Sequence, residues 1–352
     1  MASSFTIKNS VQQLFPAYFA LVMSTGIVSI ASHLLQFVFV SNLLFWINNL
    51  AFGVLFILYG TRLVLFFSSF KADLSSHAKG AGFLSIVAAS GILGVQYVLL
   101  KQNFAVAILL WVFGICVWLV LIYTFLILIF IKKEKPSLEE GINGSWLLLV
   151  VSSQSLSILG TLIAPHLSLT TNLTFFITLT FYLLGFLLYI ILITIIIYRL
   201  GFFALKAEEV TPTYWIDTGA AAISTLAGAT LAKSVVGVLP FQNFIPIIDV
   251  LNLLAWASAT WWIPIVFVLE LWRHKQIPLQ YHPSYWSMVF PLGMYTVATW
   301  RLAESLQFSF LQPVSRIFIY IAWMAWLVTF LGMCWSMVKK LRQAKSPQHI
   351  AP

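Results

Sequence analysis

Two positively charged side chains stand within long apolar segments of this sequence, where a charge is costly to keep. They are Lys233 and Arg301. Charged residues in such segments usually mark a route for ions, so these two are candidates for a positive field that attracts anions. The alternative is that each long side chain reaches along its helix to the aqueous interface, which we favour for Lys233. Arg301 can also pair with Glu304, three residues later.

One carboxylate, Asp217, stands near the start of the apolar segment that also contains Lys233. It could couple transport to protons, or it could be an interfacial acid that stabilises the start of a helix, which we favour. The six histidines are scattered without the spacing of metal ligands. No phosphate-binding glycine loop with its Lys-Ser/Thr pair occurs. We therefore expect no metal site, no cofactor and no ATP-driven step.

The composition indicates that most of the chain faces lipid. Of the 352 residues, 61% are hydrophobic and 8% are charged, whereas a soluble domain carries about 25% charged residues. The net charge of +9 does not indicate nucleic acid, because the basic residues lie in loops between apolar segments. We expect no cleavable signal peptide before the first segment. We expect a multi-pass protein of the cell membrane, which is the inner membrane in a Gram-negative bacterium.

Breaks in the apolar pattern predict ten transmembrane spans, since each span needs about 20 apolar residues. The remaining loops are too short for a soluble domain. We expect one membrane domain at 15–338, an N-terminal segment at 1–14 and a C-terminal tail at 339–352. The predicted spans are 15–35, 43–67, 80–100, 104–131, 144–164, 173–197, 214–239, 247–272, 286–306 and 316–338.

The loop charges predict the orientation of these spans. Fifteen Lys and Arg residues lie on the side that holds both termini, and two, Lys101 and Arg316, lie on the other side. Basic loops stay in the cytoplasm. Both termini are therefore predicted to be cytoplasmic.

Neighbouring spans differ in kind. Odd-numbered spans are rich in Gly, Ala, Ser and Thr, whereas the even-numbered spans are mostly Leu, Ile, Phe and Tyr, as in 119–131 and 183–197. Small residues let helices approach closely, and bulky aliphatic residues suit lipid. We therefore expect an all-α membrane protein of five helical hairpins with the odd helices inside. The small residues could serve tight packing, or they could surround a pore that their hydroxyls wet.

Motifs in three odd spans resemble one known family, the tellurite-resistance/dicarboxylate transporter family. It includes plant slow-type anion channels, bacterial tellurite-resistance channels, and fungal malate and sulfite transporters. The resemblance implies five hairpins around a central pore in each protomer, and a homotrimer of independently conducting protomers. The motifs are Phe15-Pro16 with Met23-Ser24-Thr25-Gly26-Ile27, Tyr214-Trp215-Ile216-Asp217 with Thr225-Leu226-Ala227-Gly228, and Phe290-Pro291-Leu292-Gly293.

The same resemblance singles out Phe290 among the 30 phenylalanines of the chain. In that family a phenylalanine of the ninth helix, next to a proline, blocks the pore as a gate. An aromatic ring in a narrow pore obstructs ions and dewets the constriction, and Pro291 could kink the helix to aim it. Other residues in the odd spans could shape a lumen through kinks, or could serve close helix contacts. These are Pro16, Gly26, Gly91, Gly94, Gly160, Gly228 and Gly293.

Three functions compete. The first is passive or gated movement of small inorganic or organic anions through a pore in each protomer. The second is proton-coupled carriage of four-carbon dicarboxylates, sulfite or tellurite. The third, a membrane-embedded enzyme, is distant, because it needs paired carboxylates, a His–Asp cluster or metal ligands on facing helices, and the spans supply too few. We therefore expect no catalytic residues, and we expect anions and the lipid bilayer as partners, with no nucleic acid.

Overall fold

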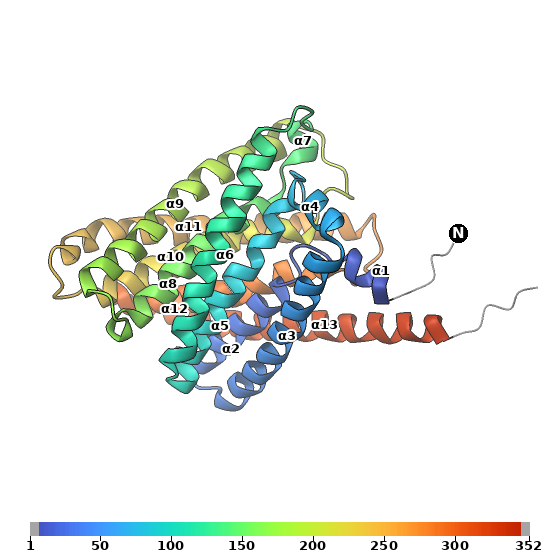
Figure 1. Cartoon of the computed structure of the whole chain (residues 1–352). Helices are drawn as coiled ribbons and strands as arrows, with labels where there is room; N and C mark the ends of the chain where they lie inside the picture. Colours follow the sequence, from blue (N-terminus) through green and yellow to red (C-terminus); the bar gives the residue numbers. More distant parts are fainter. Residues whose placement is uncertain (1–6, 346–352) are drawn as a thin grey trace, which may run out of the picture.

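The computed structural model describes residues 7–345, which form helices joined by turns. Within this range ten helices have 15 residues or more, and consecutive ones pair as five hairpins (Figure 1). The pairs are α2 (Ala20–Leu34) with α3 (Val38–Leu65), α5 (Ser85–Lys101) with α6 (Phe104–Phe130), α8 (Leu148–Ile163) with α9 (Thr171–Phe202), α10 (Ile216–Ser234) with α11 (Ile245–His274), and α12 (Trp286–Ser305) with α13 (Gln312–Lys345).

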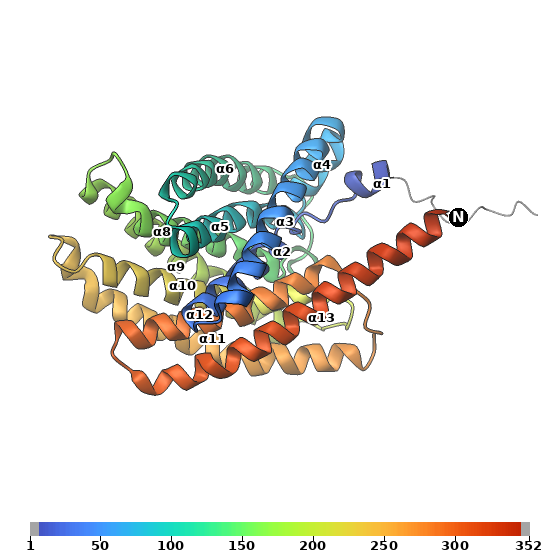
Figure 2. The ribbon, with the colours of Figure 1, turned by 90° about the horizontal axis from the view of Figure 1, so that it is seen from below.

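Shorter helices occupy the N-terminal segment and two connections. They are α1 (Ile7–Gln12), α4 (Phe67–Leu74) and α7 (Leu138–Gly141). The helix α13 continues beyond the predicted end of the last span at 338, to Lys345. The rest of the predicted C-terminal tail, and the first six residues of the predicted N-terminal segment, lie outside the described residues. In both views of the ribbon, α13 extends beyond the bundle at the end where α1 lies (Figures 1 and 2).

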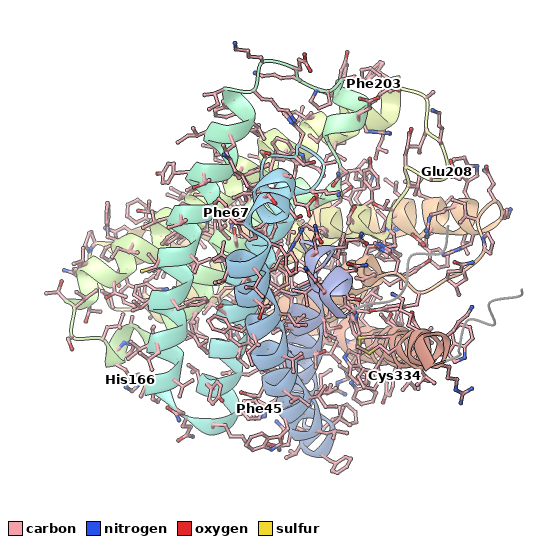
Figure 3. All side chains as sticks on the ribbon, turned by 45° about the vertical axis from the view of Figure 1, so that its right-hand side comes forward. Phe45, Phe67, His166, Phe203, Glu208 and Cys334 are labelled. Carbon is pink, nitrogen blue, oxygen red and sulfur yellow. The ribbon has the colours of Figure 1, made fainter. Side chains whose placement is uncertain are left out.

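Seven helices of the described chain are long and apolar enough to cross a membrane by length and composition. With their adjoining turns these are α3, α5, α6, α8, α9, α11 and α13. The other three long helices, α2, α10 and α12, are largely covered by protein. Of these, α2 is apolar but has only 15 residues. Figure 3 shows how far one helix reaches, with His166 just before α9 at one end of the bundle and Phe203 and Glu208 just after α9 at the other.

The inner helices α2, α5, α8, α10 and α12 form a closed ring. Each packs against the next, and α12 returns to α2. Four of them begin in a 3₁₀ turn: Gly80–Leu84, Gly144–Leu147, Pro212–Trp215 and Pro283–Tyr285. Successive turns contact one another, so the N-terminal ends of these helices meet at one end of the ring. The inner helices therefore run parallel, and each outer helix returns along the outside.

Burial separates the two kinds of helix as the composition predicts. In the most apolar 18-residue window, 94% of the residues are buried in α8 with its flanking turns, but only 22% in α13 and its preceding turn. The outer helices expose large side chains such as Phe39, Leu109 and Phe176. The expectation that the odd spans are central and the even ones peripheral is confirmed. Cys116 is exposed on α6 and is thus one of the side chains on this outer surface.

Most hydroxyls of the inner helices serve packing. Ser90 and Ser224 each donate to the carbonyl four residues earlier, at 2.7 and 2.8 Å. Ser24 reaches across to the Trp286 carbonyl of α12 at 2.6 Å, and Ser157 to the Thr178 carbonyl of α9 at 2.7 Å. A hydroxyl that is satisfied in this way can be buried between helices at little cost. The tight-packing interpretation of these residues holds for most of the ring.

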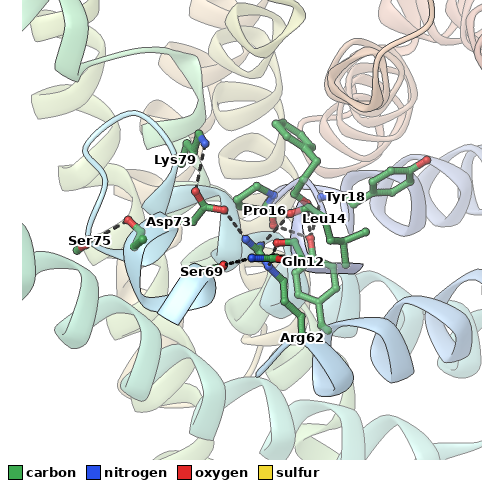
Figure 4. Close-up of polar contacts among 12 residues, drawn as sticks. Gln12, Leu14, Pro16, Tyr18, Arg62, Ser69, Asp73, Ser75 and Lys79 are labelled. Carbon is green, nitrogen blue, oxygen red and sulfur yellow. Dashed lines mark hydrogen bonds and ion pairs between the residues drawn. The ribbon is translucent and has the colours of Figure 1, made fainter. Parts of the chain in front are cut away.

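At the end where α1 lies, a buried arginine ties the N-terminal segment to the bundle (Figure 4). Arg62, at the end of α3, is 1% exposed. It donates to the Gln12 carbonyl at 3.1 Å and to the Leu14 carbonyl at 2.8 Å, and its third donor group pairs with Asp73. Lys79 holds the other oxygen of that carboxylate at 3.1 Å. The guanidinium thus joins three segments of the chain.

Two other outer helices end in a similar way. Arg199 of α9 is also 1% exposed and donates to Glu209 in the following loop at 2.9 Å. Arg273 of α11 donates to Glu270 at 2.9 Å and to the Tyr285 hydroxyl at 3.0 Å. The Arg199–Glu209 pair and the Arg273–Tyr285 hydrogen bond therefore tie α9 and α11 to the connections that lead into α10 and α12.

Gly228→Ala should lower the melting temperature of the detergent-purified protein. A Cβ at this position of α10 would overlap Asn252 of α11 and stand 2.8 Å from the Tyr182 hydroxyl of α9, and overpacking typically costs about 1–3 kcal/mol. Gly53, on α3, is the matched control, because nothing lies within 4 Å of its Cβ position. Gly53→Ala should be neutral or stabilising. Equal melting temperatures for the two variants would contradict close helix contact at Gly228.

Candidate functional site

A cavity of about 230 Å³ lies between the C-terminal halves of the five inner helices. Every inner helix contributes to its wall, so the cavity lies inside the ring. This volume can hold several water molecules or a small anion. Its lining residues are Ile27, Ile30 and Leu34 of α2; Gly91, Ile92, Val95 and Leu99 of α5; Ser155, Ile158 and Leu162 of α8; Leu226, Ala229, Thr230, Lys233 and Ser234 of α10; and Met294, Val297, Arg301 and Glu304 of α12.

The wall of the cavity is mostly apolar. Three hydroxyl residues line it, Ser155, Thr230 and Ser234, and the remainder of the lining below the charged rim is aliphatic apart from Gly91 and Met294. Two of the three hydroxyls also donate to their own helix, Ser155 at 2.7 Å and Thr230 at 2.7 Å. The expectation of a lumen wetted mainly by hydroxyls therefore describes a minor part of this surface.

Charged residues gather at the rim, where α10 and α12 end. Arg301 donates to Glu304 at 2.7 Å, which confirms the expected pair. Lys233 lies 4.0 Å from the same carboxylate oxygen, and 67% of its side chain is exposed. The structure thus brings together Lys233 and Arg301, the two cations that the sequence singled out, and both lie against the carboxylate of Glu304. The three side chains carry a net charge of +1.

Phe290 lies on the inner face of the ring, beyond the closed end of the cavity. The lining residues of α12 recur every three or four positions, and the same helical stripe continued by one turn reaches Phe290. Its side chain is 1% exposed. On α10 the corresponding stripe reaches Gly219, where a Cβ would stand 3.0 Å from Phe290 Cε1. The ring of Phe290 therefore packs on α10, the neighbouring inner helix, below the cavity floor.

Pro291 lies inside α12 and packs on the same glycine, with its Cγ 2.9 Å from the Cβ position of Gly219. Proline has no N–H to donate to the preceding turn. Only a residue without a side chain can face both rings at this distance. Gly219 and the Phe290-Pro291 pair thus form one contact between the neighbouring inner helices α10 and α12. The sequence analysis gave this glycine no role.

The other predicted lumen-shaping residues lie mainly at helix contacts. Gly91 is the one that lines the cavity among the described residues, and it packs on Ser155. Pro16 precedes α2, and its carbonyl accepts the Tyr59 hydroxyl at 2.8 Å. The remaining glycines each lie against a neighbouring helix. The contacts are Gly26 with Ile92, Gly94 with Leu159, Gly160 with Thr178 and Trp111, Gly228 with Asn252, and Gly293 with Ile27 and Val28.

Asp217 does not lie on the stripe of α10 that lines the cavity and reaches Gly219. It lies two residues before Gly219, almost opposite it around the helix, and it is fully buried rather than exposed at an interface. Neither carboxylate oxygen has a hydrogen-bond partner within residues 7–345. The structure therefore does not bring Asp217 together with Lys233 and Arg301.

Sequence reasoning missed most of the cavity wall. The aliphatic residues that line it, such as Ile30, Ile158 and Val297, look like any other core residues. A stripe at three- and four-residue spacing is detectable only when the other faces of a helix differ from it. The inner helices are buried on nearly all sides, so this signal is weak.

Residues 13–334 match the family described as voltage-dependent anion channel. The chain is 26% identical to the uncharacterized transporter MJ0762 of Methanocaldococcus jannaschii, over 90% of this chain and 92% of that protein. It is 24% identical to the uncharacterized transporter MJ0576 of the same organism, over 91% and 92%. It is 30% identical to the uncharacterized membrane protein Rv1735c of Mycobacterium tuberculosis strain H37Rv, over 42% of this chain and 75% of that protein.

A cysteine at Thr230 should react with a small charged thiol reagent added from the side of the rim. Thr230 lines the cavity and is half-buried, whereas Thr225, on the same helix, is fully buried and bonded to the Ala221 carbonyl. In a background without Cys116 and Cys334, Thr230→Cys should label and Thr225→Cys should not. Equal labelling of the two variants would contradict a water-filled cavity at this position.

Proposed function

The chain belongs to the voltage-dependent anion channel family, and we propose that it conducts small anions through its own ring of five inner helices, with Phe290 as the gate. It is an integral membrane protein with several helices that suit a bilayer. The family is one of channels and transporters, which favours transport over the membrane-enzyme alternative.

The observation that carries this proposal is the position of Phe290 relative to the cavity. The cavity is open at the charged rim and ends within one helical turn of Phe290, at the level of Met294. Below it, the buried ring of Phe290 meets Gly219. An aromatic ring held across a narrow passage obstructs ions and excludes water. A closed gate requires a passage that is open on one side of an aromatic side chain and blocked by it, and the cavity and Phe290 are arranged in this way.

The charge at the rim supports selection for anions. Arg301 and Lys233 outweigh Glu304 by one positive charge, and the wall beyond the rim offers few polar groups to cations. A cleft of one sign with low-dielectric walls concentrates counter-ions. The loop charges place the opposite end of the bundle in the cytoplasm, so the rim faces outward in this proposal and both termini are cytoplasmic. The ten long helices would then be ten spans.

A proton-coupled carrier is the second candidate, and Asp217 is the observation that favours it. Its carboxyl is buried without a hydrogen-bond partner among the described residues, and such a group can bind a proton during a transport cycle. Two relatives are named transporters, which leaves carriage open. The substrates would be four-carbon dicarboxylates, sulfite or tellurite. The homotrimer that the resemblance implies is compatible with both candidates, because the passage lies within one protomer.

Phe290→Ala should raise the anion current of the reconstituted protein by roughly tenfold or more, because it removes the steric and dewetting barrier. Planar bilayers with chloride on both sides give the measurement. Phe176→Ala is the matched control, since that ring is 61% exposed on the outer surface of α9, and it should leave the current unchanged. An unchanged current in Phe290→Ala, with the protein intact by size-exclusion chromatography, would remove the gate role.

Dissipating the proton gradient separates the channel from the carrier. Proteoliposomes that contain the wild-type protein should show chloride, nitrate, sulfite or malate flux that an uncoupler leaves intact. If an uncoupler abolishes accumulation of the anion, and Asp217→Asn abolishes it as well, the carrier replaces the channel as the function of this chain.

A further inference from the structure

We propose that Glu304 sets the strength with which the rim of the cavity holds anions, so that it tunes the affinity and throughput of the passage. The inference rests on the proposed function, because it concerns the ions that enter the same cavity. It goes further in assigning a role to an acidic residue in a site that otherwise attracts negative charge.

Glu304 is the residue on which the charges of the rim converge. Its Oε2 accepts from Arg301 at 2.7 Å and lies 4.0 Å from Lys233 Nζ. Its Oε1 accepts from Trp300 Nε1 at 3.0 Å. Trp300 and Arg301 of its own helix therefore fix the carboxylate, and Lys233 of α10 lies beside it.

Glu304 also stands between two cavities. It lines the central cavity, and together with Lys233 it lines a second cavity of about 500 Å³ beside the rim. The second cavity is formed by the ends of α10 and α12 and the starts of α11 and α13, and it also contains Asp249. Glu304 and Lys233 thus line both cavities, and their charges act on ions in either one.

The two cations hold this carboxylate unequally. Arg301 is close and 24% exposed, so its pair with Glu304 is well formed. Lys233 is at the limit of ion-pair distance and 67% exposed, and an exposed pair of this kind contributes little to stability. Glu304 therefore cancels the charge of Arg301, while Lys233 is left to interact with an entering anion.

Conduction needs a site that is attractive enough to fill and weak enough to empty. With Glu304 neutral, the rim would carry two uncompensated cations beside an apolar wall, and an anion would be held longer. With Glu304 charged, the net charge is +1. The carboxylate thus limits binding at the rim and keeps the throughput high when anions are abundant.

Glu304→Gln should lower the half-saturating chloride concentration for current by roughly three- to tenfold. The amide keeps an oxygen that can accept from Arg301 or Trp300, so the local structure is retained. The measurement is unitary conductance against chloride concentration, made in the Phe290→Ala protein so that current is present. The difference in half-saturating chloride concentration between the variant and its parent should shrink in a background of about 1 M salt, where the Debye length is roughly 3 Å.

Lys233→Gln should shift the half-saturating concentration in the opposite direction, and adding it to Glu304→Gln should bring the value back toward that of the parent. Glu140→Gln is the control, since it removes an exposed carboxylate from the short helix α7, at the other end of the inner helices. It should leave the value unchanged. Because Lys233 is exposed, its variant reports on the rim even if Glu304→Gln does not assemble.

The inference is overturned if Glu304→Gln leaves the half-saturating concentration within twofold of the parent, or if its effect is independent of salt. A purely structural role for Glu304 would reduce the current equally at all concentrations. If the Phe290→Ala protein itself carries no anion current, the proposed function fails. If the Phe290→Ala protein conducts but the Glu304 and Lys233 variants leave the half-saturating concentration unchanged, only this inference fails.

Discussion

The close approach of five parallel inner helices is the constraint on which the rest of this structure depends. The ring closes because small residues face the contacts between inner helices, as at Gly94 against Leu159 and Gly293 against Ile27. In a bilayer, such contacts replace the hydrophobic force that packs soluble helices. The ring leaves a cavity at one end, and at the level of Gly219 the rings of Phe290 and Pro291 pack against α10.

The two ends of the bundle use charge differently. At the end where α1 lies, Arg62 is buried and bound to Asp73 of α4, and Arg199 is buried and bound to Glu209 of the following loop, so these charges hold the connections in place. At the rim of the cavity, Lys233 is exposed and Arg301 is half-buried, and both share a single carboxylate. Basic residues thus fasten the chain at one end, whereas at the other end an unbalanced positive charge remains available to ions.

Much of the architecture could be predicted from the sequence, because the bilayer restricts what an apolar segment can do. The alternation of small and bulky segments gave the hairpins and the inner position of the odd helices, and the family resemblance pointed to Phe290. Details that depend on three-dimensional register could not be predicted. Asp217 looks interfacial in the sequence but is fully buried. Most hydroxyls of the ring bond to carbonyls, and whether Ser155 or Ser157 faces the cavity depends on the rotation of α8 within the ring.

The central claim is that anions pass through the inner ring and that Phe290 closes it. The most direct measurement is the reversal potential of the Phe290→Ala protein in a planar bilayer that separates two unequal concentrations of potassium chloride. The account predicts a reversal potential near the chloride equilibrium potential, since the rim of Lys233, Arg301 and Glu304 carries a net positive charge. A reversal potential near that of potassium, or near zero, would contradict it.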